Sequence, residues 1–369
     1  MAKHQQINGK RPVTSFCTNR ATYFDCGDAK QFDVSQLLVG TDWQLFAFDF
    51  ERREALFVRV SPGADLFEAP FLHQELYSRA CELVALPFDG FLALSKRLVE
   101  PQTTVHVLSI GRCGSTLAHH LFHNASGVLS VSEPDTYIGL TMMRNDLDED
   151  ESVALLKAAN SFHFRSGAQR GDHTLVVKHH SQTLFIAERL RMASPNAKFM
   201  FMYREGESWA NSVCQMAQSY GFPILQDRSA REKFWHIVSG GQDSKTVVDF
   251  IDPAHEEPEG DRWIAALWAV YLTEYLRLWA DQFRMLAINY RDLNGDRMIS
   301  VERVFKYCGL ATNHLAQVLT AFDKDSQAGT SLAKDRKTAG FSETNYQNFR
   351  DTLAKFKTIE SSGMLLPSL

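Results

Sequence analysis

The chain lacks the long uncharged apolar run that a membrane-spanning helix needs. Such a helix takes about 20 consecutive apolar residues, and no uncharged apolar stretch among the 369 residues reaches that length. The first residues, 1–12, are polar and basic with no apolar core after them, so we expect no targeting segment. These absences predict an untargeted cytoplasmic protein with no membrane partner.

Cysteine is scarce and scattered. Six cysteines occur in the chain, none of them in a Cys-x-x-Cys pair. Secreted domains held by disulfides show paired cysteine spacings instead. We therefore expect reduced thiols, as in a cytosolic protein.

A strong excess of one charge is also missing. The 39 Lys and Arg against 44 Asp and Glu give a net charge of −5. That balance supplies no general attraction to nucleic acid, so we expect no nucleic-acid partner, and any polyanion would have to bind a local basic patch. An aromatic content of 11% favours a small-molecule partner. A homodimer is compatible with the sequence but does not follow from it.

The composition changes character near residues 99–102. Residues 43–60 hold two apolar runs around a charged break, which predicts a β-hairpin. Residues 69–98 carry apolar residues at mixed spacing around Pro87 and Gly90, which we interpret as one or two short helices. Residues 1–98 are therefore predicted to form a small α+β extension before a domain at 99–369.

The second part of the chain alternates short apolar runs with longer helical patterns, as parallel βαβ units do. Strands are predicted at 105–110, 174–177, 199–203 and 285–288, and helices at 116–123, 184–192, 208–219, 263–280 and 300–309. Residues 222–260, rich in proline, glycine and acidic groups, are interpreted as an inserted segment. The pattern predicts an α/β fold with a central parallel sheet.

A glycine-bearing turn follows the first of these strands. Gly111, Arg112, Cys113, Gly114, Ser115 and Thr116 lead directly into the helix. Unpaired backbone N–H groups and the positive end of the helix dipole converge at such a turn, which makes it an anion site. The loop has Gly114 where nucleoside triphosphatases place a lysine before the hydroxyl pair, which argues against an ordinary kinase or ATPase. A turn that merely starts a helix is the alternative.

This loop resembles the first motif of the sulfotransferases that use 3′-phosphoadenosine 5′-phosphosulfate (PAPS). The form with an arginine before the glycine and hydroxyl residues is that of bacterial and protein-tyrosine members, although Cys113 stands where the family usually has serine. The resemblance implies a P-loop NTPase-like three-layer α/β domain. It also implies transfer of a sulfuryl group from PAPS to a hydroxyl or amine, with 3′-phosphoadenosine 5′-phosphate (PAP) as the product.

A second anion site is predicted at the end of the strand at 199–203. Arg204 closes that strand and Ser212 follows eight residues later on a predicted helix, so the two can share one anion. The same spacing in the sulfotransferases holds the 3′-phosphate of the cofactor. The alternative is an arginine paired with Glu205 or Glu207.

Two residues are candidates for the base that accepts the acceptor's proton. On one mapping of the family's motifs the base is His180, and on the other it is Glu133, which we favour narrowly. A histidine is ready to take a proton near pH 7, whereas a glutamate needs a special environment. Lys178 matches a lysine that both branches of the family place there, and Arg112 adds charge to the reacting centre.

Other sequence features carry less weight. No metal is expected, because adjacent histidines such as His119 and His120 lack ligand spacing with carboxylates. Lys334, Arg336 and Lys337 are weak candidates for the segment that covers the adenosine in the family. A P-loop nucleotide or small-molecule kinase and a non-catalytic nucleotide-binding module remain as alternative functions.

Overall fold

The computed structural model describes residues 2–11, 21–63, 65–238, 259–326 and 340–369. The chain divides into two compact units. Unit 1 comprises residues 1–106 and 119–198, and unit 2 comprises residues 107–118 and 199–369. In the described ranges, no helix has the length and apolar character to cross a membrane.

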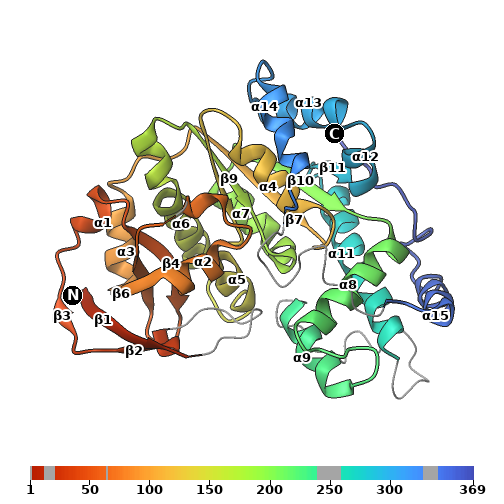
Figure 1. The fold of residues 1–369 in the computed structure, drawn as a ribbon, viewed down its shortest axis with the longest axis horizontal. Helices are drawn as coiled ribbons and strands as arrows, with labels where there is room; N and C mark the ends of the chain where they lie inside the picture. Colours follow the sequence, from red (N-terminus) through yellow and green to blue (C-terminus); the bar gives the residue numbers. More distant parts are fainter. Residues whose placement is uncertain (1, 12–20, 64, 239–258, 327–339) are drawn as a thin grey trace. The chain divides into compact units, whose positions relative to one another are not determined.

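An antiparallel sheet lies in unit 1, drawn in red and orange in Figure 1. Its order is β2-β1-β6-β5-β4, with β3 also paired to β1. The strands are β1 (Lys3–Lys10), β2 (Phe24–Cys26), β3 (Lys30–Gln31), β4 (Trp43–Asp49), β5 (Glu54–Val60) and β6 (Ala80–Pro87). Strands β4 and β5 pair antiparallel, which confirms the hairpin predicted at residues 43–60.

The interpretation of residues 69–98 as helices alone is wrong in its middle part. Helices α2 (Leu72–Arg79) and α3 (Phe88–Ser95) flank the strand β6. Residues 83–86 of β6 are all buried, on both faces of the strand, so they are apolar in succession rather than alternating. A short continuous apolar run does not distinguish a buried strand from a buried helix.

The remaining helices of unit 1 pack around an aromatic core. They are η1 (Ala21–Tyr23), α1 (Gln36–Val39), η2 (Leu66–Glu68), α5 (Asp135–Met142), α6 (Glu149–Arg170), η3 (Ser181–Ile186) and α7 (Ala187–Ala193). Phe162 of α6 packs against Phe57 of β5 and Phe91 of α3, with ring centroids 5.0 and 4.8 Å apart. Each such buried ring contributes about 1.5–3 kcal/mol, which fixes α6 to the antiparallel sheet.

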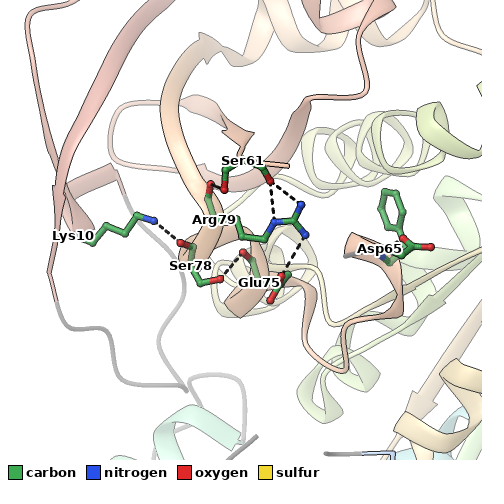
Figure 2. A network of polar contacts seen from close by, with 7 residues as sticks. Lys10, Ser61, Asp65, Glu75, Ser78 and Arg79 are labelled. Atoms are coloured by element: carbon green, nitrogen blue, oxygen red, sulfur yellow. Dashed lines mark hydrogen bonds and ion pairs between the residues drawn. The ribbon is translucent and has the colours of Figure 1, made fainter. Parts of the chain in front are cut away.

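A network of polar contacts holds α2 in place (Figure 2). The Arg79 guanidinium donates to the Ser61 carbonyl oxygen at 2.8 Å and pairs with Glu75 at 3.3 Å. The Lys10 ammonium donates to the Ser78 carbonyl oxygen at 2.6 Å. The C-terminal end of α2 is thus tied to the ends of β5 and β1, which fixes the helix that also carries His73.

A second sheet of five strands has the order β11-β10-β7-β9-β8. Its strands are β7 (Thr103–Ser109), β8 (Val128–Ser132), β9 (Thr174–Lys178), β10 (Lys198–Tyr203) and β11 (Leu286–Asn289). The pairs β8–β9 and β10–β11 are parallel, which confirms the predicted α/β class with a central parallel sheet. All strands of the antiparallel sheet precede residue 98, and the domain boundary at 98/99 itself stays a prediction.

Unit 2 is mainly helical. Its helices are α8 (Gly206–Ser219), α9 (Arg228–Val238), α11 (Gly260–Ala280), α12 (Tyr290–Gly295), α13 (Arg297–Cys308), α14 (Leu315–Leu319), η4 (Thr320–Asp323) and α15 (Glu343–Leu353), while α4 (Ser115–His123) begins in unit 2 and ends in unit 1. Within the predicted insertion, residues 228–238 form α9, and residues 239–258 lie outside the described residues. Buried aromatic residues of α11, including Trp268 and Tyr275, form much of this core.

Candidate functional site

The loop between β7 and α4 has the backbone of an anion-binding turn. Gly111, Arg112 and Gly114 have φ of 68°, 51° and 83°, all in the left-handed region. Residues in the left-handed conformation within one loop can turn their backbone N–H groups toward the same side, where these groups can bind an anion. Helix α4 begins at Ser115, one residue before the predicted start, so Ser115 and Thr116 lie in its first turn.

Contacts with neighbouring elements of unit 2 hold this loop. The Trp209 indole N–H donates to the Gly111 carbonyl oxygen at 2.9 Å, and the Cys113 thiol lies 3.3 Å from the Met202 carbonyl oxygen. Cys113 is fully buried, and its side chain contacts β10. The cysteine therefore helps to pack the loop onto β10 as a small, buried apolar side chain.

Gly114 occupies a position that admits no side chain. A Cβ there would lie 2.6 Å from Tyr290 Cδ2, and φ is +83°. The contact places the aromatic ring of Tyr290, the first residue of α12, directly against the loop. Tyr290 is not among the site residues predicted from the sequence.

We expect Gly114→Ala to destabilise the protein and impair the loop, since both steric overlap and backbone strain oppose it. Gly171→Ala is the matched control, because Gly171 has φ of +86° with nothing within 4 Å of a Cβ. The control should cost only the left-handed strain, about 1–2 kcal/mol, and Gly114→Ala should cost more. Urea unfolding of both variants measures the difference, and equal losses would contradict the steric argument.

Two predicted anion-binding motifs converge in unit 2. The Arg112 Nε donates to the Ser212 hydroxyl at 3.0 Å, and an Arg204 guanidinium N–H donates to the Arg112 carbonyl oxygen at 3.4 Å. The Arg204 Nε donates to the hydroxyl of Ser208, 2.8 Å away. Ser212 thus contacts Arg112 directly, and Ser208, one turn before it on α8, contacts Arg204. Sequence reasoning missed Ser208, although its i−4 relation to Ser212 was a signal.

The charge of this arrangement is positive. Arg204 makes no ion pair with any carboxylate of the described residues, and its guanidinium lies 4.8 Å from the centroid of the Tyr290 ring. Burial lowers the pKa of Arg112, and the neighbouring Arg204 lowers it further, but a guanidinium stays charged at neutral pH. Two arginines and two hydroxyls beside a helix N-terminus suit a phosphate or sulfate group.

A second cluster of predicted site residues lies in unit 1. Glu133 follows β8, and Lys178 ends β9, the strand that pairs with β8 in parallel. The Lys178 ammonium forms an ion pair with Oε1 of Glu133, and His180 Nδ1 lies 3.3 Å from Oε2 of the same carboxylate. His73 of α2 joins them, with its Nδ1 3.1 Å from the Glu133 carbonyl oxygen. Both candidate bases and the predicted lysine thus meet in one place.

Glu133 has an unusual backbone. Its φ is +52°, and in the described residues only Arg53, Arg112 and Gln282 share a positive φ without being glycine. The Glu133 N–H donates to the Lys178 carbonyl oxygen at 2.7 Å, which holds the strained residue at the sheet edge. Such conformations cost about 1–3 kcal/mol and cluster at functional sites. Two of these four residues are Arg112 and Glu133, both predicted from the sequence to act in the reaction.

The environment sets the protonation of this cluster. Burial alone would raise the pKa of Glu133, but Lys178, His180 and His73 outweigh it and lower that pKa. Burial lowers the pKa of His180 to about 4, against the opposing effect of Glu133. At neutral pH Glu133 is therefore a carboxylate and His180 a neutral imidazole. His180 Nε2 is buried and has no hydrogen-bond partner in the described part of the chain.

Sequence reasoning missed His73 entirely. It lies 60 residues before Glu133 on another element, and no local pattern marks it. The adjacent His179 and His180 have different partners, since His179 Nε2 is 2.8 Å from His106 Nδ1 while His180 Nδ1 is 3.3 Å from Glu133 Oε2. His119 instead forms a hydrogen bond with the Ser130 hydroxyl at 2.8 Å.

The weak cofactor candidates Lys334, Arg336 and Lys337 lie outside the described residues.

Comparison with known proteins gives matches among solved structures alone. No family model matches the sequence, and no curated protein matches it. A sulfotransferase from Mycobacterium avium is similar at 13% identity, covering 74% of this chain and 81% of its own, with a TM-score of 0.40. Retinol dehydratase, in complex with androsterone and the inactive cofactor PAP, is similar at 14% identity over 75% and 87%, with a TM-score of 0.38.

A third similar structure is the sulfotransferase domain of the Synechococcus olefin synthase. Its identity is 14% over 68% of this chain and 94% of that domain, with a TM-score of 0.36. Two of these three similar structures are named as sulfotransferases, the family that the motifs of this chain resemble. At identities and TM-scores this low, no residue role is taken over from these structures. The roles of residues are argued from the contacts within this chain.

Proposed function

We propose that this protein is a sulfotransferase that moves a sulfuryl group from PAPS to a hydroxyl or amine of a small-molecule acceptor. The observation that carries the proposal is the convergence of Arg112, Ser212, Arg204 and Ser208 at the β7–α4 loop. PAPS presents a 3′-phosphate and a 5′-phosphosulfate, and two arginines with two hydroxyls supply charged and directed donors for such anions.

The loop has a role in the transfer step as well as in binding. Sulfuryl transfer resembles phosphoryl transfer, which depends on positioning and on positive charge near the transferred group. Backbone N–H groups of residues 112–116 would hold the phosphosulfate, since the Gly111 N–H donates to the Ser109 hydroxyl at 3.2 Å, and Arg112 would stabilise charge on its oxygens. The arginine is held by Ser212, so little reorganisation is needed when the cofactor binds.

The cluster of unit 1 supplies the base. Both oxygens of Glu133 are engaged, one by Lys178 and one by His180, whereas the buried Nε2 of His180 has no hydrogen-bond partner in the described part of the chain. With its proton on Nδ1, facing Glu133, His180 keeps the lone pair on Nε2. We therefore assign proton transfer to His180 Nε2 and assign to Glu133 the role of fixing the tautomer and stabilising the imidazolium. This reverses the narrow preference for Glu133 drawn from the sequence.

Binding of PAP to the purified protein, measured by calorimetry without added metal, tests the cofactor. We expect Arg204→Ala to weaken PAP binding at least tenfold, because a charged hydrogen bond to phosphate contributes about 1.5–3 kcal/mol. Arg11→Ala is the matched control, since Arg11 is an exposed arginine of unit 1 paired with Asp25 and should leave binding unchanged.

The outcomes separate the alternative functions. Absence of PAP binding together with Mg²⁺-dependent ATP hydrolysis would indicate a kinase and overturn the proposal. PAP binding that never leads to turnover of PAPS, over a panel of alcohols, phenols and amines, would indicate a nucleotide-binding module instead.

A further inference from the structure

Three side chains of unit 1 bring metal-ligand atoms together. His73, Glu133 and His180 each offer one ligand atom, and these atoms lie within 4.8 Å of one another. We propose that the three residues form a binding site for a divalent transition metal ion such as Zn²⁺. The sequence predicted no metal, because its adjacent histidines lack ligand spacing with carboxylates, whereas these three residues come from separate segments of the chain.

The ligand set and its spacing suit such an ion. Two imidazoles and one carboxylate are typical ligands of Zn²⁺ and its neighbours, whereas Mg²⁺ and Ca²⁺ prefer oxygen ligands alone. Metal–ligand bonds of about 2.0–2.2 Å place neighbouring ligand atoms roughly 3.3–3.5 Å apart in a tetrahedral site. Glu133 Oε2 and His180 Nδ1 are already 3.3 Å apart. The ligand atom of His73 lies within 4.8 Å of the other two.

The position of His73 supports its role as a ligand. Its Nδ1 lies 3.1 Å from the Glu133 carbonyl oxygen, and donation of the Nδ1 proton to that oxygen leaves the lone pair on Nε2. Metal-binding histidines commonly donate their second ring N–H to a backbone carbonyl in this way. The network of Figure 2 anchors α2, so the helix that presents His73 is fixed before the ion arrives.

Lys178 weakens binding of the ion but leaves one oxygen of Glu133 available to it. Its ammonium pairs with Oε1 of Glu133, which leaves Oε2 to coordinate the ion. Its positive charge opposes a cation nearby, so we expect reversible binding in place of a permanently held structural ion. The fourth coordination position would be left to water, as in open metal sites.

The ion would also block proton transfer, and this consequence rests on the proposed function. Coordination through His180 Nδ1 moves the proton of the neutral ring to Nε2, so no net proton is gained or lost. The nitrogen assigned to accept the acceptor's proton then carries a proton already. Zn²⁺ should therefore inhibit turnover without weakening the binding of PAP.

Cobalt titration tests the metal site independently of any sulfotransferase activity. The whole protein, first freed of metal by a chelator, is titrated with Co²⁺ and followed by its visible absorption, and Zn²⁺ is then added in competition. We expect one ion per chain, and His73→Ala and the milder His73→Gln should each weaken binding more than about tenfold. His236→Ala, which removes an exposed histidine of α9, should leave binding unchanged.

The result that overturns the proposal is saturable binding that both His73 variants retain, or no saturable binding at all. Far-UV circular dichroism of the His73 variants confirms that any loss arises in a folded protein. Because the titration contains no nucleotide, failure of PAP to bind in the earlier experiment leaves this result intact, and the reverse also holds.

Discussion

Lys178→Met is expected to lower the free energy of unfolding by about 3–5 kcal/mol, the usual cost of removing one partner of a buried ion pair. The side chain of Lys178 is 2% exposed and that of Glu133 is 15% exposed. Methionine fills a similar volume but leaves the carboxylate without its main counter-charge. The pKa of Glu133, which Lys178 lowers in the native protein, should rise in the variant.

Urea unfolding of matched variants measures this effect. Lys157→Met is the control, because Lys157 pairs with Glu100 at 3.1 Å with both side chains more than half exposed, and exposed pairs contribute about 0–1 kcal/mol. The double variant Lys178→Met/Glu133→Gln should recover most of the loss, since no buried charge remains. A double variant as unstable as Lys178→Met alone would show that packing, and not charge, causes the loss.

The pH dependence of the Lys178→Met effect has a definite sign. In the variant the raised pKa of Glu133 makes its buried carboxylate costly above that pKa. As pH falls from 7 toward the ordinary glutamate value of 4.5, the carboxyl takes up a proton and the cost disappears. The difference in stability between native protein and variant should therefore shrink on acidification.

The parallel sheet was predictable because its signals are local. The strand before Gly111 and the strand that ends at Tyr203 are short apolar runs followed by helical patterns, and both lie where the sequence predicted them. The loop that follows β7 was predictable for the same reason, since glycines, an arginine and two hydroxyls stand in one contiguous stretch. In a strand-to-helix turn of this kind, the groups that bind the anion are neighbours in the sequence, so the sequence alone can reveal the site.

The unpredicted parts depend on contacts between distant segments. The strand β6 has an apolar run that suits helix and strand equally, and only its pairing with β1 and β5 decides between them. His73 reaches Glu133 because α2 is anchored by Arg79 and Lys10, which no periodicity reveals. The choice between Glu133 and His180 as base could not be made from spacing, because the structure places both in one hydrogen-bonded group.

Replacing His180 should cause the largest loss of activity. We expect His180→Gln to reduce PAPS turnover about 10²–10⁴-fold, the usual contribution of a positioned base. PAP binding should stay within about twofold, because the residues assigned to the phosphates are Arg112, Arg204 and their hydroxyl partners in unit 2, and general-base loss acts on the chemical step. His236→Ala serves again as the control. The measurement is release of PAP in the presence of the best acceptor from a panel of alcohols, phenols and amines.

Glu133→Gln separates the two candidate bases. If Glu133 itself takes the proton, this variant loses activity while His180→Gln keeps most of it, which would refute the assignment to His180. If His180 is the base, both variants lose activity, because the amide no longer fixes the tautomer or stabilises the imidazolium.

The pH profile of the native enzyme gives a second criterion. Since burial holds the pKa of His180 near 4, the native rate should stay flat between about pH 5.5 and 7.5, where an ordinary histidine with pKa near 6.5 would titrate.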